Sequence, residues 1–188
     1  MSILAFKAAM SQSGNRNNQF RVTLTFPAFV TGGSAAATAA QFLCHTASLP
    51  GQTIGVAEVM YRGRQVKLPG ERTFENWQVT IYNDADMKIH SAFESWMQSI
   101  NNKQENSGMT NSLDFTSSLL VEQLDRNGVT LKSYTFSDAW PTNIGAIALS
   151  FADNNTIQSF TCDLAYSWFE ANAYNGGTLT LSTALGNL

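Results

Sequence analysis

The two cysteines and two histidines of this chain are its candidates for a nucleophile, a general base or a metal ligand. Their spacing argues against a shared site. Cys44 and His45 are adjacent, within a segment over 42–48 that reads as a strand. Because neighbouring strand residues point to opposite faces, these two cannot form a nucleophile–base dyad with each other. His90 and Cys162 lie far along the chain, without the short repeats that mark a zinc site. We therefore expect no catalytic residue, no bound metal and no cofactor.

Two other motifs suggest ligands only weakly. The run Asp153-Asn154-Asn155 has the residue types of a calcium loop, but the glycine and closing glutamate of an EF-hand are missing. A turn is the better interpretation. Gly63 and Gly70, with their neighbours, match no nucleotide-binding glycine pattern.

A concentration of basic residues lies between 52 and 72. Four of the eleven lysines and arginines fall there, namely Arg62, Arg64, Lys67 and Arg72. They could contact nucleic acid, pair with acidic residues of another subunit, or belong to a solvated loop. Three nearby glutamates, at 58, 71 and 75, lower the local charge and weaken the nucleic-acid reading.

The composition favours a globular protein with an unusually uncharged surface. Of the 188 residues, 44% are hydrophobic and only 13% are charged, about half the usual share of roughly 25%. A soluble surface with so few charges is often covered in an assembly. The net charge of −3 lacks the basic excess of a nucleic-acid binder.

The chain carries no obvious membrane or secretion signal. No apolar run approaches the roughly 18 residues that span a bilayer, and no basic stretch opens the sequence. Two cysteines are too few for a disulfide framework, although a single bridge is conceivable. We expect buried thiols, no membrane anchor and an intracellular location.

Strand patterns dominate the chain. Alternating apolar and polar residues predict strands at 19–26, 42–48, 73–82, 119–124, 129–136, 147–151 and 157–168. The small residues of 31–41 predict a flexible loop. The interrupted β pattern of 52–72 predicts an irregular hairpin or long excursion.

One helix is expected, over 84–101. Asp84 suits its N-cap, and the apolar stripe consists of Ile89, Phe93, Trp96 and Ile100. Glu94 and Gln98 lie on the opposite face, toward solvent or a partner. Six or more strands with one helix predict a mainly β protein, a single β-barrel or sandwich domain with one flanking α-helix.

Two longer stretches resemble a known family. The run Val66–Asp84 resembles the central signature of tail tube proteins from contractile-tailed phages of the T-even type, and Ala139–Gly145, with 149–151 and 154–160, resembles their second signature. Arg16–Val22 and Ala47–Pro50 match the opening strands less specifically. The signature residues expected to have structural roles are Gly70, Phe74, Trp77, Trp140 and Pro141.

The resemblance implies a single tail tube domain over 1–188 that forms hexameric rings stacked into a tube. Its parts would be an N-terminal arm at 1–17, the loop at 31–41, an extended arm at 52–72, the helix at 84–101 and a C-terminal tail at 171–188. In the resembling family the extended arm joins one subunit or ring to the next. We therefore expect Arg62, Arg64, Lys67 and Arg72 at subunit interfaces and Glu94 as a candidate sheath contact.

The same resemblance implies the partners and the location. They are the tail sheath protein, the baseplate tube initiator, a tape measure protein in the lumen, and DNA that passes without specific binding. The location is the virion, after assembly in the host bacterial cytoplasm. Six copies at −3 each give −18 per ring, which repels DNA.

Three alternatives stay open from the sequence. One is the inner tube of a related contractile machine, such as a bacteriocin, an extracellular injection particle or a type VI secretion system. Another is a baseplate tube initiator with the same barrel. The third is a small enzyme that uses Cys44 or a pair of carboxylates.

Overall fold

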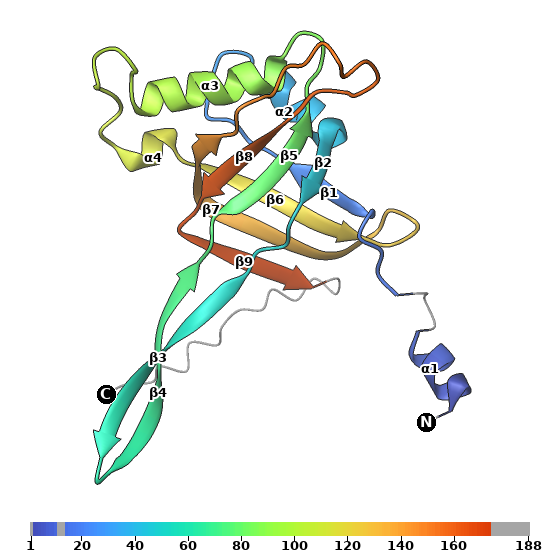
Figure 1. The fold of residues 1–188 in the computed structure, drawn as a ribbon, viewed down its shortest axis with the longest axis vertical. Helices are drawn as coiled ribbons and strands as arrows, with labels where there is room; N and C mark the ends of the chain where they lie inside the picture. Colours follow the sequence, from blue (N-terminus) through green and yellow to red (C-terminus); the bar gives the residue numbers. More distant parts are fainter. Residues whose placement is uncertain (1, 11–13, 174–188) are drawn as a thin grey trace.

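The computed structural model describes residues 2–10 and 14–173, and most of them belong to a mainly β body (Figure 1). The strands are β1 (Phe20–Thr23), β2 (Cys44–Ala47), β3 (Gln52–Tyr61), β4 (Arg64–Phe74), β5 (Trp77–Tyr82), β6 (Ser117–Leu124), β7 (Thr130–Ile144), β8 (Ser159–Ala165) and β9 (Trp168–Ala173). The helices are α1 (Ile3–Ala9), α2 (Gly33–Leu43), α3 (Lys88–Ile100) and α4 (Ser112–Phe115). The predicted fold class, a single mainly β domain with a flanking helix, is confirmed.

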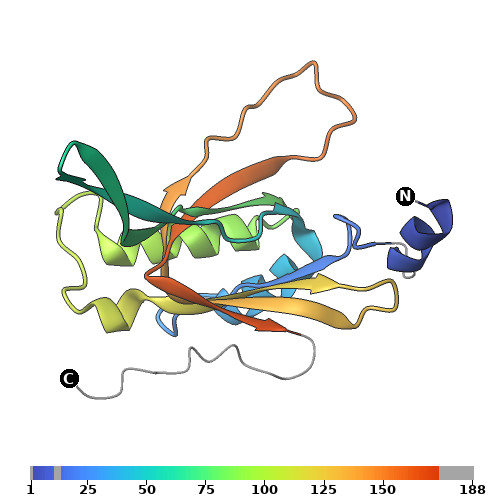
Figure 2. The same ribbon diagram turned by 90° about the horizontal axis from the view of Figure 1, so that it is seen from below.

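The body depends on one long strand that belongs to both of its layers. The strand order is β1-β6-β7-β8-β5-β2, and β9 also pairs with β7. The first part of β7 pairs with β6 and β9, and its last part, from Trp140, pairs with β8. Figure 2 shows the result, in which β1, β6 and β9 form one layer and β5 and β8 the other.

The core lies between these layers and follows the alternation of the strands. In β5, Trp77, Val79 and Ile81 are buried, and Phe136 of β7 stacks on Trp77 with ring centroids 4.4 Å apart. Their neighbours on β8 are equally buried. The hydrophobic effect is the main source of stability for such a closed apolar layer.

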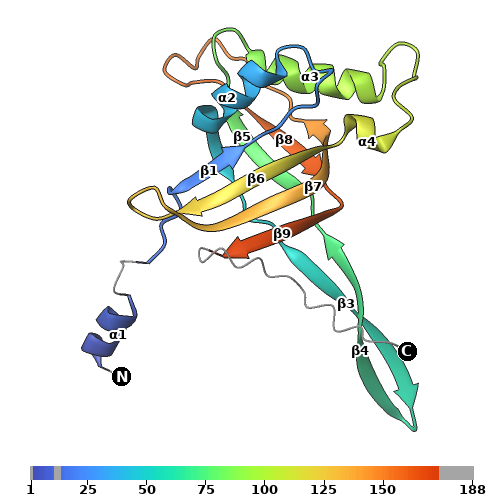
Figure 3. The same ribbon diagram turned by 180° about the vertical axis from the view of Figure 1, so that it is seen from behind.

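Helix α3 covers one end of the layered body (Figure 3). The predicted stripe faces inward, because Ile89, Phe93 and Trp96 are fully buried and Ile100 is half-buried. The Trp96 indole N–H donates to the carbonyl of Phe115, at 2.7 Å, so the one polar atom of that ring is satisfied.

The start of this helix differs from the prediction. The N-cap is Met87, not Asp84, because Asp84–Met87 forms a turn that delays the first helical residue to Lys88. Asp84 still serves the helix, since its Oδ1 accepts the backbone N–H of Lys88 at 2.9 Å. The capping residue expected from the sequence, Asp84, therefore does contact the helix, but it lies one turn before the first helical residue.

The prediction of a flexible loop over 31–41 is wrong, because residues 33–43 form α2. Alanine has the highest helix propensity of the residues, so an Ala-rich run becomes helical once one of its faces can pack. Gly33, Ala36 and Ala40 are buried against the body. A Cβ on Gly33 would lie 2.8 Å from the Cβ of Phe26, so the helix approaches the chain too closely for a larger residue.

Other expected boundaries also change. No strand forms over 147–151, because residues 145–158 make a long loop that no neighbouring strand pairs with. The strand predicted at 42–48 is β2, shortened at its start by the end of α2. The N-terminal arm carries α1, and most of the expected C-terminal tail lies outside the described residues.

Truncating Trp96 tests whether α3 is part of the core. Trp96→Ala removes a fully buried indole and its hydrogen bond, so we expect the free energy of unfolding in urea to fall by about 3–5 kcal/mol. Glu94→Gln, on the exposed face of the same helix, is the matched control and should change it by less than about 0.5 kcal/mol. Equal effects of the two changes would show that α3 is not anchored by its apolar stripe.

Candidate assembly surface

The hairpin of β3 and β4 projects from the body as an arm (Figure 1). The two strands form a separate two-stranded sheet, and every residue from Gln52 to Thr73 is exposed. Ten residues of β3 at about 3.3 Å each make it roughly 33 Å long. An isolated hairpin is at best marginally stable in water, so this arm needs a surface to pack on.

The tip of the arm is a two-residue turn that includes one of the predicted interface residues. Arg62 and Gly63 both have positive φ, at 48° and 78°, as the hairpin turns that match strand twist require. The Arg62 guanidinium carbon lies 5.5 Å from the centre of the Tyr61 ring, a cation–π arrangement that holds the side chain over the tip.

The register of the arm gathers five apolar residues on the face that also carries Arg64, while Val56 and Met60 are exposed on the other face. Tyr61 pairs with Arg64, Val59 with Val66, and Ala57 with Leu68, so these side chains point the same way. We call Ala57, Val59, Tyr61, Val66 and Leu68 the apolar hairpin face. Tyr61 is 63% exposed and Val59 is 48% exposed. A contiguous apolar patch of this kind marks an interaction surface.

The four basic residues are spread along the arm and do not form one cluster. Arg62 and Arg64 lie at the tip, Lys67 lies opposite Glu58, and Arg72 lies opposite Ile54 near the base. None of them makes an ion pair with any part of the chain that the structure describes. Their charges are therefore available to a partner.

The other signature residues build the base of the arm and the adjoining core. Phe74 packs on Tyr166 and Phe169, with ring centroids 5.8 and 5.5 Å away. The Trp77 indole N–H donates to the carbonyl of Ser48 at 2.7 Å. Trp140 and Pro141 lie where β7 changes partner from β9 to β8, with Pro141 buried.

The outer face of α3 is the second predicted contact surface. Glu94 is exposed, and its Oε2 lies 3.6 Å from Nδ1 of His90, one turn earlier. With Met97, Lys103 and residues 143–147 these two line a groove of about 470 Å³. The structure thus places Glu94 at an accessible position, well away from the arm.

The two thiols lie in settings that suppress nucleophilic chemistry. Burial raises the pKa of Cys44 to about 12, and burial beside the negative Asp163 raises the pKa of Cys162 further above its usual range. The thiolate is the reactive form, so both cysteines are inert near neutral pH. His45 contacts the Thr46 hydroxyl, at 3.1 Å.

The described residues show neither a grouping suited to a metal ion nor a membrane-spanning helix. Within 2–10 and 14–173, no three His, Cys, Asp or Glu side chains lie together as a metal site would need. Over the same residues, no helix has the length and apolar content needed to cross a membrane.

The apolar hairpin face was missed by sequence reasoning, although a signal was present. Residues 57, 59 and 61 before Arg62-Gly63 are apolar, as are 66 and 68 after it. Once the turn is placed at Arg62-Gly63, this spacing puts them on the same side of a hairpin. Gly55, Gly63 and Pro69-Gly70 interrupt that pattern and conceal the pairing.

Comparison with known protein families gives one match to most of the chain. The family model described as phage tail tube protein matches residues 15–172. The tail tube protein of Serratia phage KSP90 is 31% identical over 163 residues, which cover 86% of this chain and 92% of that protein. Tail tube protein gp19 of Enterobacteria phage T4 is 32% identical over 131 residues, covering 69% and 80% of the two chains.

Solved structures show the same fold at lower identity. A chain in the tube-terminating cap of the anti-feeding prophage has a TM-score of 0.56 at 17% identity, covering 85% of this chain and 91% of that one. A chain in the sheath–tube complex of the extracellular contractile injection system PVC has a TM-score of 0.54 at 14% identity, covering 92% and 99%.

Gly70→Ala tests whether the arm depends on the close approach of its strands. A Cβ on Gly70 would lie 3.0 Å from the backbone oxygen of Gly55, so the strands must separate there. We expect trypsin to cut at the exposed basic residues of the arm several-fold faster in this variant. Gly51→Ala, where nothing lies within 4 Å, should be cut at the parent rate. An unchanged cleavage pattern for Gly70→Ala would contradict this role.

Proposed function

The chain belongs to the phage tail tube protein family, and from this premise we propose that it is the structural subunit of a contractile phage tail tube. In this proposal six copies close into a ring, and the rings stack into a hollow tube inside a contractile sheath. The tube delivers DNA, and the protein has no catalytic role.

The observation that carries the proposal is the arm of β3 and β4. Its apolar hairpin face is exposed, it has no partner strand in the body, and its basic residues are unpaired within the described chain. A ring needs a contact between two different surfaces of identical subunits, which a projecting arm supplies. Burying the apolar hairpin face on a neighbour removes its apolar area from water.

Charge pairing is the second part of the proposed contact. We assign Arg62, Arg64, Lys67 and Arg72 to pairs with acidic residues of a neighbouring copy. The chain has fourteen acidic residues and eleven basic ones, so each copy offers carboxylates for this purpose. Arg–carboxylate pairs that are partly removed from water fix orientation, whereas exposed pairs contribute only about 0–1 kcal/mol.

The net charge of the proposed tube favours the passage of DNA over its binding. Each copy carries −3, so a ring of six carries −18 and repels the phosphates of DNA. A basic lumen would retain the nucleic acid by releasing its counterions. Further partners in this proposal are the tube initiator of the baseplate, a tape measure protein in the lumen and the sheath.

Assignment to a phage tail tube is better supported than assignment to the tube of another contractile injection machine. Both sequence relatives described above are tail tube proteins of phages, at 31% and 32% identity. The contractile injection structures share the fold at 14% and 17% identity. Such a likeness indicates architecture, since unrelated functions can use one fold.

Assembly of the purified protein tests the proposed function and the role of the arm together. We expect rings or tubes in negative-stain microscopy, alone or after addition of a baseplate seed. Arg64→Glu combined with Arg72→Glu should abolish them and leave the circular dichroism spectrum of the monomer unchanged, because both residues are exposed on the arm.

The matched control is Arg126→Glu combined with Lys132→Glu, which changes the net charge equally on the exposed surface of the body. It should assemble as the parent does. A parent that stays monomeric even when seeded would remove the proposed function. Normal tubes from the arm variant would remove only the role given to its arginines.

Sheath recruitment tests the proposal that the outer face of α3 meets the sheath. Glu94→Lys reverses an exposed charge, so we expect normal tubes that recruit less sheath in a co-assembly assay scored by microscopy. Glu105→Lys, in the exposed segment after the same helix, is the control. Parental sheath recruitment by the Glu94→Lys tubes would leave α3 with a purely structural role.

A further inference from the structure

A second projection of the molecule is not accounted for by the arm. The loop over 145–158 joins β7 to β8, and Figure 2 shows it extending away from both layers on the side of β5 and β8. Three of its apolar side chains are strongly exposed: Phe151 is wholly exposed, Leu149 is 83% exposed and Ile157 is 67% exposed. A loop that presents large apolar residues to water needs a covering surface.

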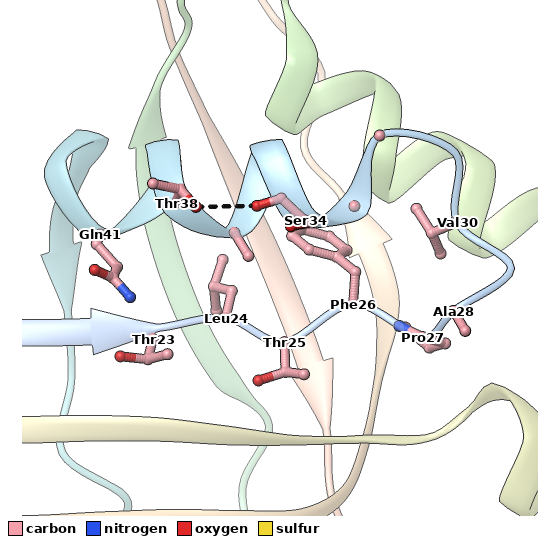
Figure 4. Close-up of a pocket in the computed structure, with 13 residues that line it drawn as sticks. Thr23, Leu24, Thr25, Phe26, Pro27, Ala28, Val30, Ser34, Thr38 and Gln41 are labelled. Carbon is pink, nitrogen blue, oxygen red and sulfur yellow. Dashed lines mark hydrogen bonds between the residues drawn. The ribbon is translucent and has the colours of Figure 1, made fainter.

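A groove lined by uncharged residues lies between α2 and the segment that follows β1. It has a volume of about 560 Å³, within the range of pockets that hold ligands. Figure 4 shows Leu24 and Phe26 pointing toward α2, with Ser34 and Thr38 on the helix above them. None of the thirteen residues that line the groove is charged.

The backbone beside this groove also lacks partners. Neither Thr25 nor Phe26 makes a backbone hydrogen bond to another described residue, because the pairing of β1 with β6 ends at Thr23. Backbone N–H and C=O groups that become covered need hydrogen-bond partners. An extended segment laid along 24–28 would supply them.

We propose that the loop over 145–158 is a second intersubunit arm, and that its Leu149–Phe151 tip inserts into the α2 groove of another copy of this chain. The inference rests on the proposed function, because it makes a second contact of the same assembly. It identifies the groove along α2 as the receiving surface, a feature that the arm of β3 and β4 does not involve.

The positions of the two surfaces favour another copy as the occupant. The loop leaves the molecule on the side of β5 and β8 (Figure 2). Helix α2 and strand β1 lie together at the front of Figure 3, which shows the molecule from behind. Two complementary surfaces on different sides of one subunit make a heterologous contact, which closes into rings or continues as a filament. A groove and a tip at 149–152 that both lack charged residues can meet without burying an unpaired charge.

Cysteine pairing tests this contact directly. Phe151→Cys and Thr38→Cys are made separately and mixed under assembly conditions with a mild oxidant. We expect disulfide-linked pairs of chains in the mixture and not in either variant alone. Cys162 is buried and Cys44 is half-buried, and the parent protein serves as the control for both native thiols. Asn154→Cys mixed with Thr38→Cys is the matched control for proximity and should link far less.

Truncation tests the energetic importance of the tip. Phe151→Ser combined with Leu149→Ser should raise the critical concentration for assembly at least about tenfold, as expected when central apolar anchors are lost. The monomer should keep its circular dichroism spectrum, because both side chains lie outside the core. Ala148→Ser, an exposed position of the same loop, should assemble normally.

The outcomes separate the inference from the proposed function. Normal assembly by the Phe151→Ser/Leu149→Ser variant, or absence of the 151–38 disulfide in parental-looking tubes, would overturn the second arm and leave the tube function intact. Failure of the parent itself to assemble would instead overturn the proposed function. Loss of assembly in the loop variant together with the 151–38 disulfide would establish the contact.

Discussion

The continuous pairing of β7 with β8 and β9 is the interaction on which the rest of the structure depends. Because one fifteen-residue strand belongs to both layers, the aromatic residues of one layer reach those of the other, as in the stack of Phe136 on Trp77. The register shift between Pro141 and Asn143 marks an irregularity in this pairing. Bulges of this type increase local twist and re-aim a strand, which a sheet that folds back on itself requires.

The two projections of this layered body contribute little to its internal packing. The arm of β3 and β4 and the loop over 145–158 contribute no fully buried residue to the core, although Phe74 at the base of the arm and Ile147 of the loop pack beside it. Their exposed apolar side chains therefore have no explanation within one copy of the chain. Apolar surface that is exposed in the monomer and needed nowhere inside it is most simply explained by burial in an assembly.

The distribution of charge fits the same division. The core contains no buried polar or charged side chain among the described residues, and burial raises the pKa of Cys162 within it and of half-buried Cys44 beside it. Charged residues lie instead on exposed surfaces, and the arm carries six of them, at 58, 62, 64, 67, 71 and 72. The chain thus has exposed surfaces for contact and an apolar core for stability.

The sequence by itself determined the elements whose pattern is local. The period-two alternation of β5 and the apolar stripe of α3 predicted which side chains are buried, because each element buries one face of its own. Tertiary contacts decided the rest. The Ala-rich run became α2 because its small residues pack beside Phe26, and 147–151 stayed a loop because it pairs with no strand. The apolar hairpin face emerged only when cross-strand register brought Val59 beside Val66, since pairing across a turn is not contained in either strand alone.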